Sequence, residues 1–220
     1  MYERQQGMDD RILFHGSRGG ITGEIEPKSR PRCDFGVGFY MGSNDEQAKG
    51  LIIEDAHPVL YTVKLHLSEI EENRILRLTG MDWVYTVLAC REKVKSFLNT
   101  PMAEACLKKL EQADVVIGPI ADDRMNEAMR RLEDYGMTDK ALEACLQSVD
   151  YGEQFVAKTP HACGCIEIVS REDISGQEAD DIREYVSAMR VQSRNIVQEM
   201  QLKYQREGKY LNELIQEAVG

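Results

Sequence analysis

The sequence predicts an α+β fold, because its strand-like and helix-like segments do not alternate regularly along the chain. Residues 59–67 alternate apolar and polar side chains, which is typical of a strand with one buried face. Residues 82–98 and 101–111 instead carry apolar side chains at helical spacing. A doubly wound sheet would need strands and helices in regular βαβ units, so the irregular order favours the α+β class.

The first 170 residues carry short strands and helices separated by turns. Residues 11–15 form an apolar run that ends at Gly16 and Ser17, which predicts a buried strand entering a tight loop. Residues 18–37 contain glycines, prolines and arginines without periodicity and are predicted to be a loop. Further strands are expected at residues 38–41, 59–67, 74–78, 114–117, 154–157 and 165–169, and helices at residues 43–54, 82–98, 101–111, 122–132 and 138–146. The expected helix N-caps are Ser43 or Asn44, Asp122 and Thr138.

The C-terminal segment has a different character from the rest of the chain. Residues 179–219 are highly charged and helical in composition, with a single glycine, Gly208. Their apolar side chains leave a broken stripe, which predicts one long helix or two shorter helices that pack on the domain or receive a partner. We therefore divide the chain into a domain at residues 1–170 and a helical C-terminal extension at residues 171–220.

The composition disfavours several functional classes. The chain has 220 residues, of which 42% are hydrophobic and 30% charged, and a formal net charge of −11. No apolar run approaches the roughly 18 residues needed to cross a bilayer, and the charged N-terminus lacks the apolar core of a signal peptide. We therefore expect a cytoplasmic protein with no membrane partner. An acidic surface repels phosphate backbones, so nucleic acid is also disfavoured as a partner.

The six cysteines are predicted to be reduced thiols. Cys90, Cys106 and Cys145 lie in helix-like apolar patterns and are expected to fill core space. Cys163 and Cys165 follow His161, but this spacing differs from that of zinc ligand pairs, and no second pair completes a tetrahedron. We expect no metal site there, and we expect Cys163 and Cys165 to share one face of a strand.

Two short motifs carry the candidate chemistry. The first is Leu13-Phe14-His15-Gly16-Ser17, and the second is Asp34-Phe35-Gly36-Val37-Gly38-Phe39-Tyr40-Met41. Together they resemble the motifs of histidine-type ADP-ribosyltransferases, the group that contains the catalytic domains of diphtheria toxin and poly(ADP-ribose) polymerases. The amino-acid sequence of these motifs is most similar to that of a bacterial domain family of unknown function, number 3990, which is regarded as ADP-ribosyltransferase-like. Residues 118–123 and 153–157 also resemble members of that family.

The resemblance implies a split β-sandwich with surrounding helices and a cleft that binds NAD as a substrate. It assigns the ribose contact to His15, a close backbone approach to Gly16 and the stacking face to Tyr40. Arg18 either meets the pyrophosphate of NAD or is a solvated loop arginine. The cofactor-binding residues that the resemblance implies are His15, Gly16, Ser17, Arg18, Gly38, Phe39, Tyr40 and Leu51. The implied catalytic residues are His15, Tyr40 and Gln154.

Two positions depart from the pattern of active relatives. Gln154 stands where those relatives usually carry a glutamate, and an amide cannot act as a base. Glu153 is expected to point to the opposite face of the strand, which makes it a poor substitute. Leu51 stands where relatives usually carry an aromatic side chain that closes the nicotinamide pocket. These departures argue against polymer elongation and leave transfer of a single ADP-ribose open.

The sequence therefore supports two main functional hypotheses. The first is an NAD-dependent mono-ADP-ribosyltransferase, with a toxin-like activity on a protein acceptor and a small regulatory or antitoxin partner as a further candidate. The alternative is a non-catalytic module of the same fold that binds NAD, another nucleotide or a partner. A third hypothesis is a scaffold that works through its C-terminal helices. Taken alone, His15 would also fit a core histidine whose hydrogen bonds are made within the protein.

Overall fold

The computed structural model describes residues 9–120, 123–148 and 152–219. Within these residues seven strands form one mixed sheet in the order β4-β5-β6-β2-β1-β3-β7. The strands are β1 Arg11–Ser17, β2 Phe39–Gly42, β3 Val59–Leu65, β4 Ile75–Arg77, β5 Val115–Pro119, β6 Glu153–Ala157 and β7 Ile166–Asp173. β4 and β5 pair in parallel, and the other neighbouring strands are antiparallel. The α+β class is confirmed.

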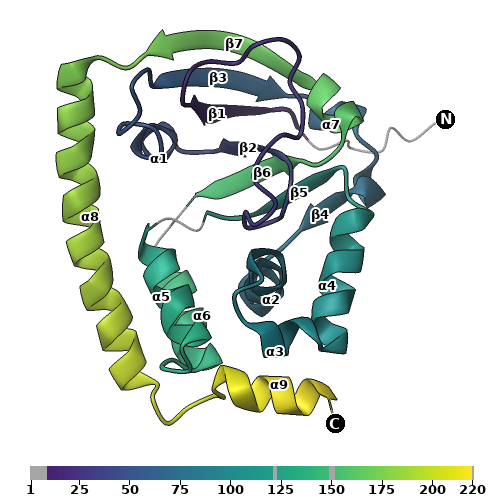
Figure 1. The fold of residues 1–220 in the computed structure, drawn as a ribbon, viewed down its shortest axis with the longest axis vertical. Helices are drawn as coiled ribbons and strands as arrows, with labels where there is room; N and C mark the ends of the chain where they lie inside the picture. The colour runs from purple at the N-terminus through teal and green to yellow at the C-terminus, as the bar shows by residue number, and fades with distance from the viewer. Residues whose placement is uncertain (1–8, 121–122, 149–151, 220) are drawn as a thin grey trace.

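The backbone pairing between β1 and β2 is shorter than that between any other neighbouring strands of the sheet. These strands are paired at Phe14 and Gly42 alone, whereas β1 and β3 pair over seven residues from Arg11 to Ser17. We call this point the β1–β2 junction. It separates β7, β3 and β1 from β2, β6, β5 and β4. In Figure 1, β6, β5 and β4 run at a different slope from β7, β3 and β1. The strands thus form two wings of one continuous sheet.

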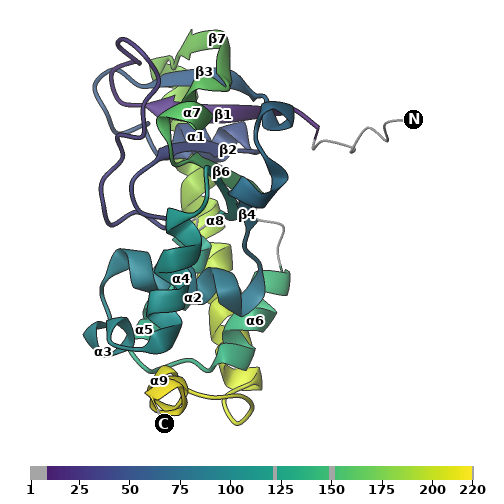
Figure 2. The same cartoon turned by 90° about the vertical axis from the view of Figure 1, so that its right-hand side faces the viewer.

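The helices gather mainly at the end of the sheet that carries β4 and β5. Figure 1 and Figure 2 show the sheet in one half of the molecule and most helices in the other, with α8 running along both halves. The α-helices are α1 Asp45–Gly50, α2 Gly80–Arg91, α3 Lys95–Leu98, α4 Pro101–Glu111, α5 Asp123–Glu133, α6 Asp139–Ser148, α7 Pro160–Gly164, α8 Gly176–Lys203 and α9 Leu211–Val219. Two 3-10 helices lie at Leu67–Glu69 and Glu72–Arg74.

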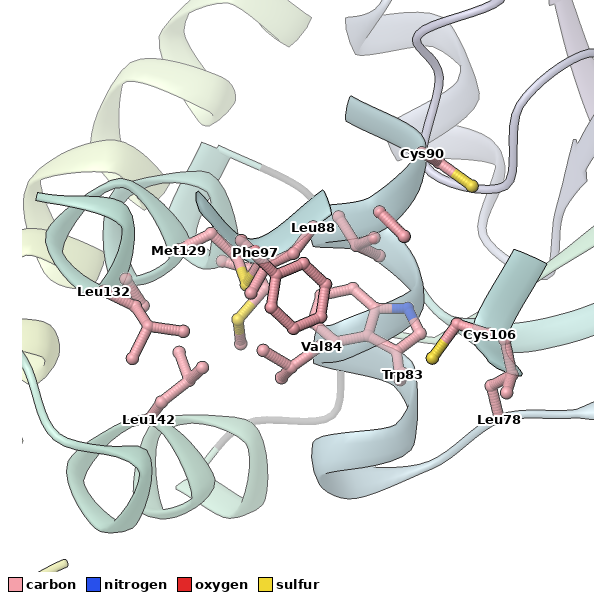
Figure 3. Close-up of a cluster of buried hydrophobic side chains, with 14 of the residues drawn as sticks. Leu78, Trp83, Val84, Leu88, Cys90, Phe97, Cys106, Met129, Leu132 and Leu142 are labelled. Atoms are coloured by element: carbon pink, nitrogen blue, oxygen red, sulfur yellow. The ribbon is translucent and has the colours of Figure 1, made fainter. Parts of the chain in front are cut away.

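Two hydrophobic cores lie on opposite faces of the sheet. The helical core contains Trp83, Val84, Leu88 and Phe97 of α2 and α3, which face Met129, Leu132 and Leu142 of α5 and α6 in Figure 3. The loop-side core contains Leu13, Phe39, Tyr61 and Phe155 from the strands, with Ile21 and Ile25 packed against it. The loop of residues 18–37 joins the two cores, because it adds Ile21 and Ile25 to one and Phe35 to the other.

Several predicted helix starts are found where the sequence places them. Asn44, the second of the two predicted caps, accepts a hydrogen bond from the amide of Gln47 and begins α1. Thr138 accepts a hydrogen bond from the amide of Ala141 at the start of α6. The cap predicted at Asp122 lies outside the described residues. The cysteines of α2, α4 and α6 are buried free thiols, as predicted, at Cys90, Cys106 and Cys145.

Two predictions about local structure are wrong. The helix expected at residues 82–98 is interrupted, because Glu92 adopts a left-handed conformation with φ of 54° and ends α2. The strand expected at residues 165–169 is present as β7 but begins at Ile166, so neither Cys163 nor Cys165 belongs to it. Cys163 belongs instead to α7, which Thr159 caps by accepting from the amide of Ala162. The two thiols therefore do not share a strand face.

The C-terminal segment forms two helices and shares the core of the preceding residues. α8 buries Val197, and α9 buries Leu211, both within the helical core. Between them Gly208 has φ of 78°, and a Cβ there would lie 2.1 Å from Oδ1 of Asp139. β7 continues through residue 170, where sequence analysis divides the chain. Residues 171–219 are thus packed as an integral part of the structure.

Candidate functional site

His15 lies at the β1–β2 junction and links the two strands. Its Nδ1 lies 2.7 Å from the carbonyl oxygen of Tyr40 in β2. Its ring stacks on Phe39, with ring centroids 4.2 Å apart and planes inclined by 24°. Tyr61 of β3 adds a second, tilted ring contact at 6.4 Å. The imidazole is therefore held from three sides by neighbouring strands.

These contacts determine the protonation state and the tautomer of His15. Burial lowers the pKa of the imidazole, an effect that the hydrogen bond to the Tyr40 carbonyl opposes in part. The ring is consequently neutral near pH 7. A carbonyl oxygen can only accept a hydrogen bond, so the proton must reside on Nδ1. Nε2 is left with a lone pair and acts as a hydrogen-bond acceptor.

Tyr40 holds the end of the loop of residues 18–37 in place through two hydrogen bonds. Its hydroxyl donates to the carbonyl oxygen of Gly36 at 2.7 Å and accepts from the amide of Phe35 at 3.0 Å. Burial raises the pKa of the phenol, so the hydroxyl stays protonated and keeps both bonds. The ring packs against the helical core. Tyr40 thus couples β2 to the loop that precedes it.

His15 and Tyr40 present their side chains on opposite faces of the sheet. Directly paired residues of antiparallel strands share a face, and Tyr40 is paired with Val156 of the helical core. His15 stacks on Phe39, whose neighbours form the loop-side core. The structure therefore joins the two predicted residues through the main chain of β2, and their rings are separated by the sheet.

Gln154 lies on the same face as Tyr40. It pairs with Gly42 across β2 and β6 and is 7% exposed. Its amide nitrogen donates to the carbonyl oxygen of Pro119 at 2.9 Å and to Oδ2 of Asp34 at 3.2 Å. Glu153 is exposed and lies 3.6 Å from Arg77, so its predicted direction away from Gln154 is confirmed.

Asp34 and Arg91 belong to the same cluster, although sequence reasoning assigned them no role. The guanidinium of Arg91 contacts Oδ1 of Asp34 through Nε at 2.9 Å and Nη2 at 2.6 Å. Their side chains are 17% and 11% exposed. Because Asp34 belongs to the second motif, its place in the sequence could have indicated a role. Arg91 lies 57 residues away from Asp34 in the sequence and belongs to neither motif. We call Asp34, Arg91 and Gln154 the carboxylate–amide cluster.

The glycines of the two motifs allow close packing within the protein. A Cβ at Gly16 would lie 2.4 Å from the carbonyl oxygen of Ala48 in α1. A Cβ at Gly38 would lie 2.4 Å from Cγ1 of Val156 in β6. Gly16 thus lets α1 approach β1, and Gly38 lets the start of β2 approach β6. These contacts position the two motif strands relative to their neighbours.

The remaining predicted cofactor residues lie around the junction with different exposure. Ser17 ends β1 opposite Val59 and is half-buried. Arg18 is largely exposed and lies 3.3 Å from Asp55, so its guanidinium has a partner within the chain. Leu51 follows α1 and is 71% exposed. It therefore contributes little to any enclosed wall.

A cavity of about 410 Å³ lies beside this site, between the loop and the helices. Phe35 and Gly36 separate it from Tyr40, and Lys158 donates to the carbonyl oxygen of Phe35 at its wall. Burial lowers the pKa of Lys158. Within the part of the chain that the structure describes, no group of three or more histidine, cysteine or acidic residues is placed to hold a metal ion.

The fold defines an α+β protein with one mixed sheet. The two strands that carry the motifs, β1 and β2, share a single residue pair, and His15 lies next to that pair. The family described as "Protein of unknown function (DUF3990)" matches residues 11–168, which is more than half of the chain. The chain belongs to this family. No curated protein and no solved structure was found to match the chain. Among the described helices, none is long and apolar enough to span a membrane.

Proposed function

We propose that the chain is an NAD-dependent mono-ADP-ribosyltransferase that acts on a protein acceptor. The observation that carries this proposal is the geometry of His15. Its imidazole is neutral, fixed by Tyr40 and Phe39, and left with Nε2 as an acceptor. A ribose hydroxyl is a suitable donor for such a nitrogen, and a rigid acceptor costs little entropy to engage.

Tyr40 and Gln154 support the proposal from the other face of the sheet. The ring of Tyr40 packs against the helical core, and its hydroxyl holds the loop of residues 18–37, so Tyr40 supports the site by positioning β2 and this loop. The side-chain amide of Gln154 can bind a ribose hydroxyl or orient an acceptor. Since Gln154 is buried and bonded to two partners, its position is fixed before a ligand arrives. The two motifs that resemble ADP-ribosyltransferases thus meet at the β1–β2 junction, with the ring of His15 on one face of the sheet and that of Tyr40 on the other.

The proposed reaction breaks the bond between the nicotinamide nitrogen and C1′ of the ribose. The electron pair of that bond leaves with nicotinamide, and C1′ acquires oxocarbenium character before the acceptor bonds to it. Holding both halves of NAD in a reactive pose is the main contribution expected of the protein. A net charge of −11 disfavours nucleic acid as the acceptor, so a protein side chain is proposed.

Nicotinamide release from NAD tests the proposal. The purified chain is incubated with NAD, alone and with a host lysate, and mass spectrometry follows the addition of ADP-ribose to proteins. His15→Phe keeps an aromatic ring against Phe39 and removes the Nε2 acceptor. Ile12→Ala on the same strand is the control, since Ile12 is an exposed side chain. Release that depends on His15 and not on Ile12 supports the transferase, whereas a folded wild type without release contradicts it.

A non-catalytic binding module is the second candidate. Two observations favour it: the amide nitrogen of Gln154 is already bonded to Asp34 and Pro119, and Leu51 leaves one side of the site open. Such a module would bind NAD with an affinity that depends on His15 but would release no nicotinamide. Calorimetric titration with NAD, run beside the release assay, separates the two functions.

A further inference from the structure

The cavity between the loop of residues 18–37 and the helices has no part in the proposed transferase function. Its volume of about 410 Å³ lies within the usual range of small-molecule sites. Most of its wall is aliphatic or aromatic and comes from the loop and from α2, α3 and α4. The apolar lining residues are Pro31, Phe35, Ala89, Leu98, Leu107 and Leu110. The cavity can therefore enclose the apolar body of a small ligand.

Lys158 brings a positive charge to this wall. It follows β6, and its side chain passes Gly38, where a Cβ would lie 3.6 Å from Cδ of the lysine. Nζ donates to the carbonyl oxygen of Phe35, and a Cβ at Gly36 would lie 3.5 Å from it. Since Phe35 and Gly36 both line the cavity, Nζ lies at its wall. Burial lowers the pKa of this amine, as expected where a charge lacks full compensation.

The charge of Lys158 has no acidic partner. The groups that favour its ammonium form are the thiols of Cys90 and Cys33, and no carboxylate of the described residues lies within ion-pair distance of Nζ. The carbonyl oxygen of Phe35 occupies one of the three N–H donors and carries no full charge. Two donors and the charge itself are therefore left for an anionic group at the wall.

Two acidic side chains limit which anions can enter. Glu92 and Glu111 also line the cavity, and both are exposed. Arg32 lies 3.1 Å from Glu92, so Glu92 has a cationic partner of its own. A ligand with several negative charges, such as a nucleoside diphosphate, would be repelled by these carboxylates. A single carboxylate on an apolar body meets less repulsion and can still pair with the amine.

We propose that this cavity binds a small hydrophobic carboxylate, whose carboxylate pairs with Nζ of Lys158 and whose hydrocarbon body contacts the apolar wall. The two remaining N–H donors of the ammonium match the two oxygens of a carboxylate. Burial of the hydrocarbon body adds the second part of the affinity. The inference does not depend on the transferase function, because Phe35 and Gly36 separate the cavity from Tyr40.

Lys158 could instead serve only to hold the carbonyl of Phe35, and the variants are chosen to separate these roles. Lys158→Met keeps an unbranched side chain and removes the charge. Lys108→Met, at an exposed lysine of α4, is the matched control. Leu107→Glu adds a negative charge to the lining at a side chain that is 40% exposed, so it offers a folded alternative where Lys158→Met loses stability. Ala105→Glu adds the same charge to α4 at an exposed position outside the lining.

The experiment titrates the full chain at pH 7 with octanoate and with octanamide, its neutral counterpart, and follows alanine and leucine methyl groups by NMR. We expect octanoate to bind at least about tenfold more tightly than octanamide, as a charge-assisted contact allows. The shifted methyl signals should belong to the wall, at Ala89, Leu98 and Leu110. Lys158→Met should weaken octanoate at least about tenfold and octanamide less than about threefold. Leu107→Glu should weaken octanoate at least about threefold.

Each result decides the inference. A wild type that binds neither probe, or that does not prefer octanoate to octanamide, overturns it. So does a folded Lys158→Met that binds octanoate as tightly as Lys108→Met, and so do methyl shifts confined to residues away from the wall. If Lys158→Met does not fold, equal octanoate affinities of Leu107→Glu and Ala105→Glu overturn the inference, whereas a loss confined to Leu107→Glu supports it. Nicotinamide release is measured separately, so failure here leaves the transferase proposal standing.

Discussion

The imidazole of His15 lies 2.7 Å from the carbonyl oxygen of Tyr40, at the point where β1 and β2 are joined by one residue pair. The hydrogen bond from the His15 side chain thus links two strands that share only one backbone residue pair, whereas the other strand pairs are linked by several. The same contact leaves Nε2 as an acceptor and holds the ring neutral. Structural support and candidate chemistry therefore depend on the same bond.

Replacing His15 by phenylalanine should affect both stability and activity. The variant keeps a ring against Phe39, but the carbonyl of Tyr40 loses its donor, so we expect the free energy of unfolding to fall by about 1–2 kcal/mol. If the proposed function holds, nicotinamide release should fall at least about tenfold, which corresponds to about 1.4 kcal/mol in the barrier. Urea unfolding and the release assay measure the two effects. Equal behaviour of His15→Phe and the exposed control Ile12→Ala would contradict both expectations.

The pKa of His15 predicts how stability changes with pH. Because burial lowers its pKa in the folded state, protonation favours the unfolded chain, whose imidazole titrates near pH 6.5. The stability of the neutral ring is present above pH 6.5 and is lost as the pH falls below it, toward the lower folded value. The urea midpoint of the wild type should therefore fall between pH 8 and pH 5 by more than that of His15→Phe.

Other titrating groups do not reverse this expectation. Hydrogen bonds from His66, Lys64 and Ser68 lower the pKa of Asp10 to about 2, from an ordinary value of 3.8. The contribution of Asp10 is thus lost only at pH values below that window. The difference between wild type and His15→Phe isolates the imidazole, since both chains share every other group. Parallel pH profiles for the two chains would contradict the assignment of a lowered pKa.

Two neighbouring glycines provide a matched pair for the packing of α1. Gly16→Ala places a Cβ 2.4 Å from the carbonyl oxygen of Ala48, so β1 and α1 must separate. We expect a loss of about 1–3 kcal/mol in stability, as for other overpacked sites. Gly19→Ala meets no atom within 4 Å and should change stability by less than about 0.5 kcal/mol. Thermal unfolding of the two variants measures the difference, and a similar melting temperature would show that α1 does not pack there.

The C-terminal helices should be required for folding. Val197 and Val191 lie in α8, but Val197 is 2% exposed within the helical core and Val191 is 58% exposed. Val197→Asp buries an unpaired carboxylate and should cost at least about 3 kcal/mol, whereas Val191→Asp should cost less than about 0.5 kcal/mol. Urea unfolding of the full chain measures both. A small effect of Val197→Asp would mean that α8 is an independent appendage.

Local signals in the sequence predicted much of the strand pattern and several helix starts. The alternation of residues 59–67 matches β3, and Asn44 caps α1 because its short side chain can accept from the amide of Gln47. These features depend on residues close together in the chain. The break at Glu92 carried no such signal, since a glutamate rarely adopts the left-handed conformation that ends α2.

The candidate site was predicted in part. Both motif strands are neighbours in the sheet, and His15 and Tyr40 are joined by a hydrogen bond. Sequence reasoning did not find that their rings lie on opposite faces, because that depends on which residues of β1, β2 and β6 are paired. It also missed Arg91, whose only relation to Asp34 is through the folded chain.

The sequence by itself determined the α+β class, the motif residues, the reduced cysteines of the helices and the family. Each of these follows from local periodicity, from residue type or from the order of short motifs. The tertiary structure alone decided that Asp34, Arg91 and Gln154 meet, that Gly16 admits α1, and that Val197 of α8 and Leu211 of α9 complete the helical core. The physical reason is that strand register and helix packing bring together groups far apart in the chain, and periodicity carries no information about such distances.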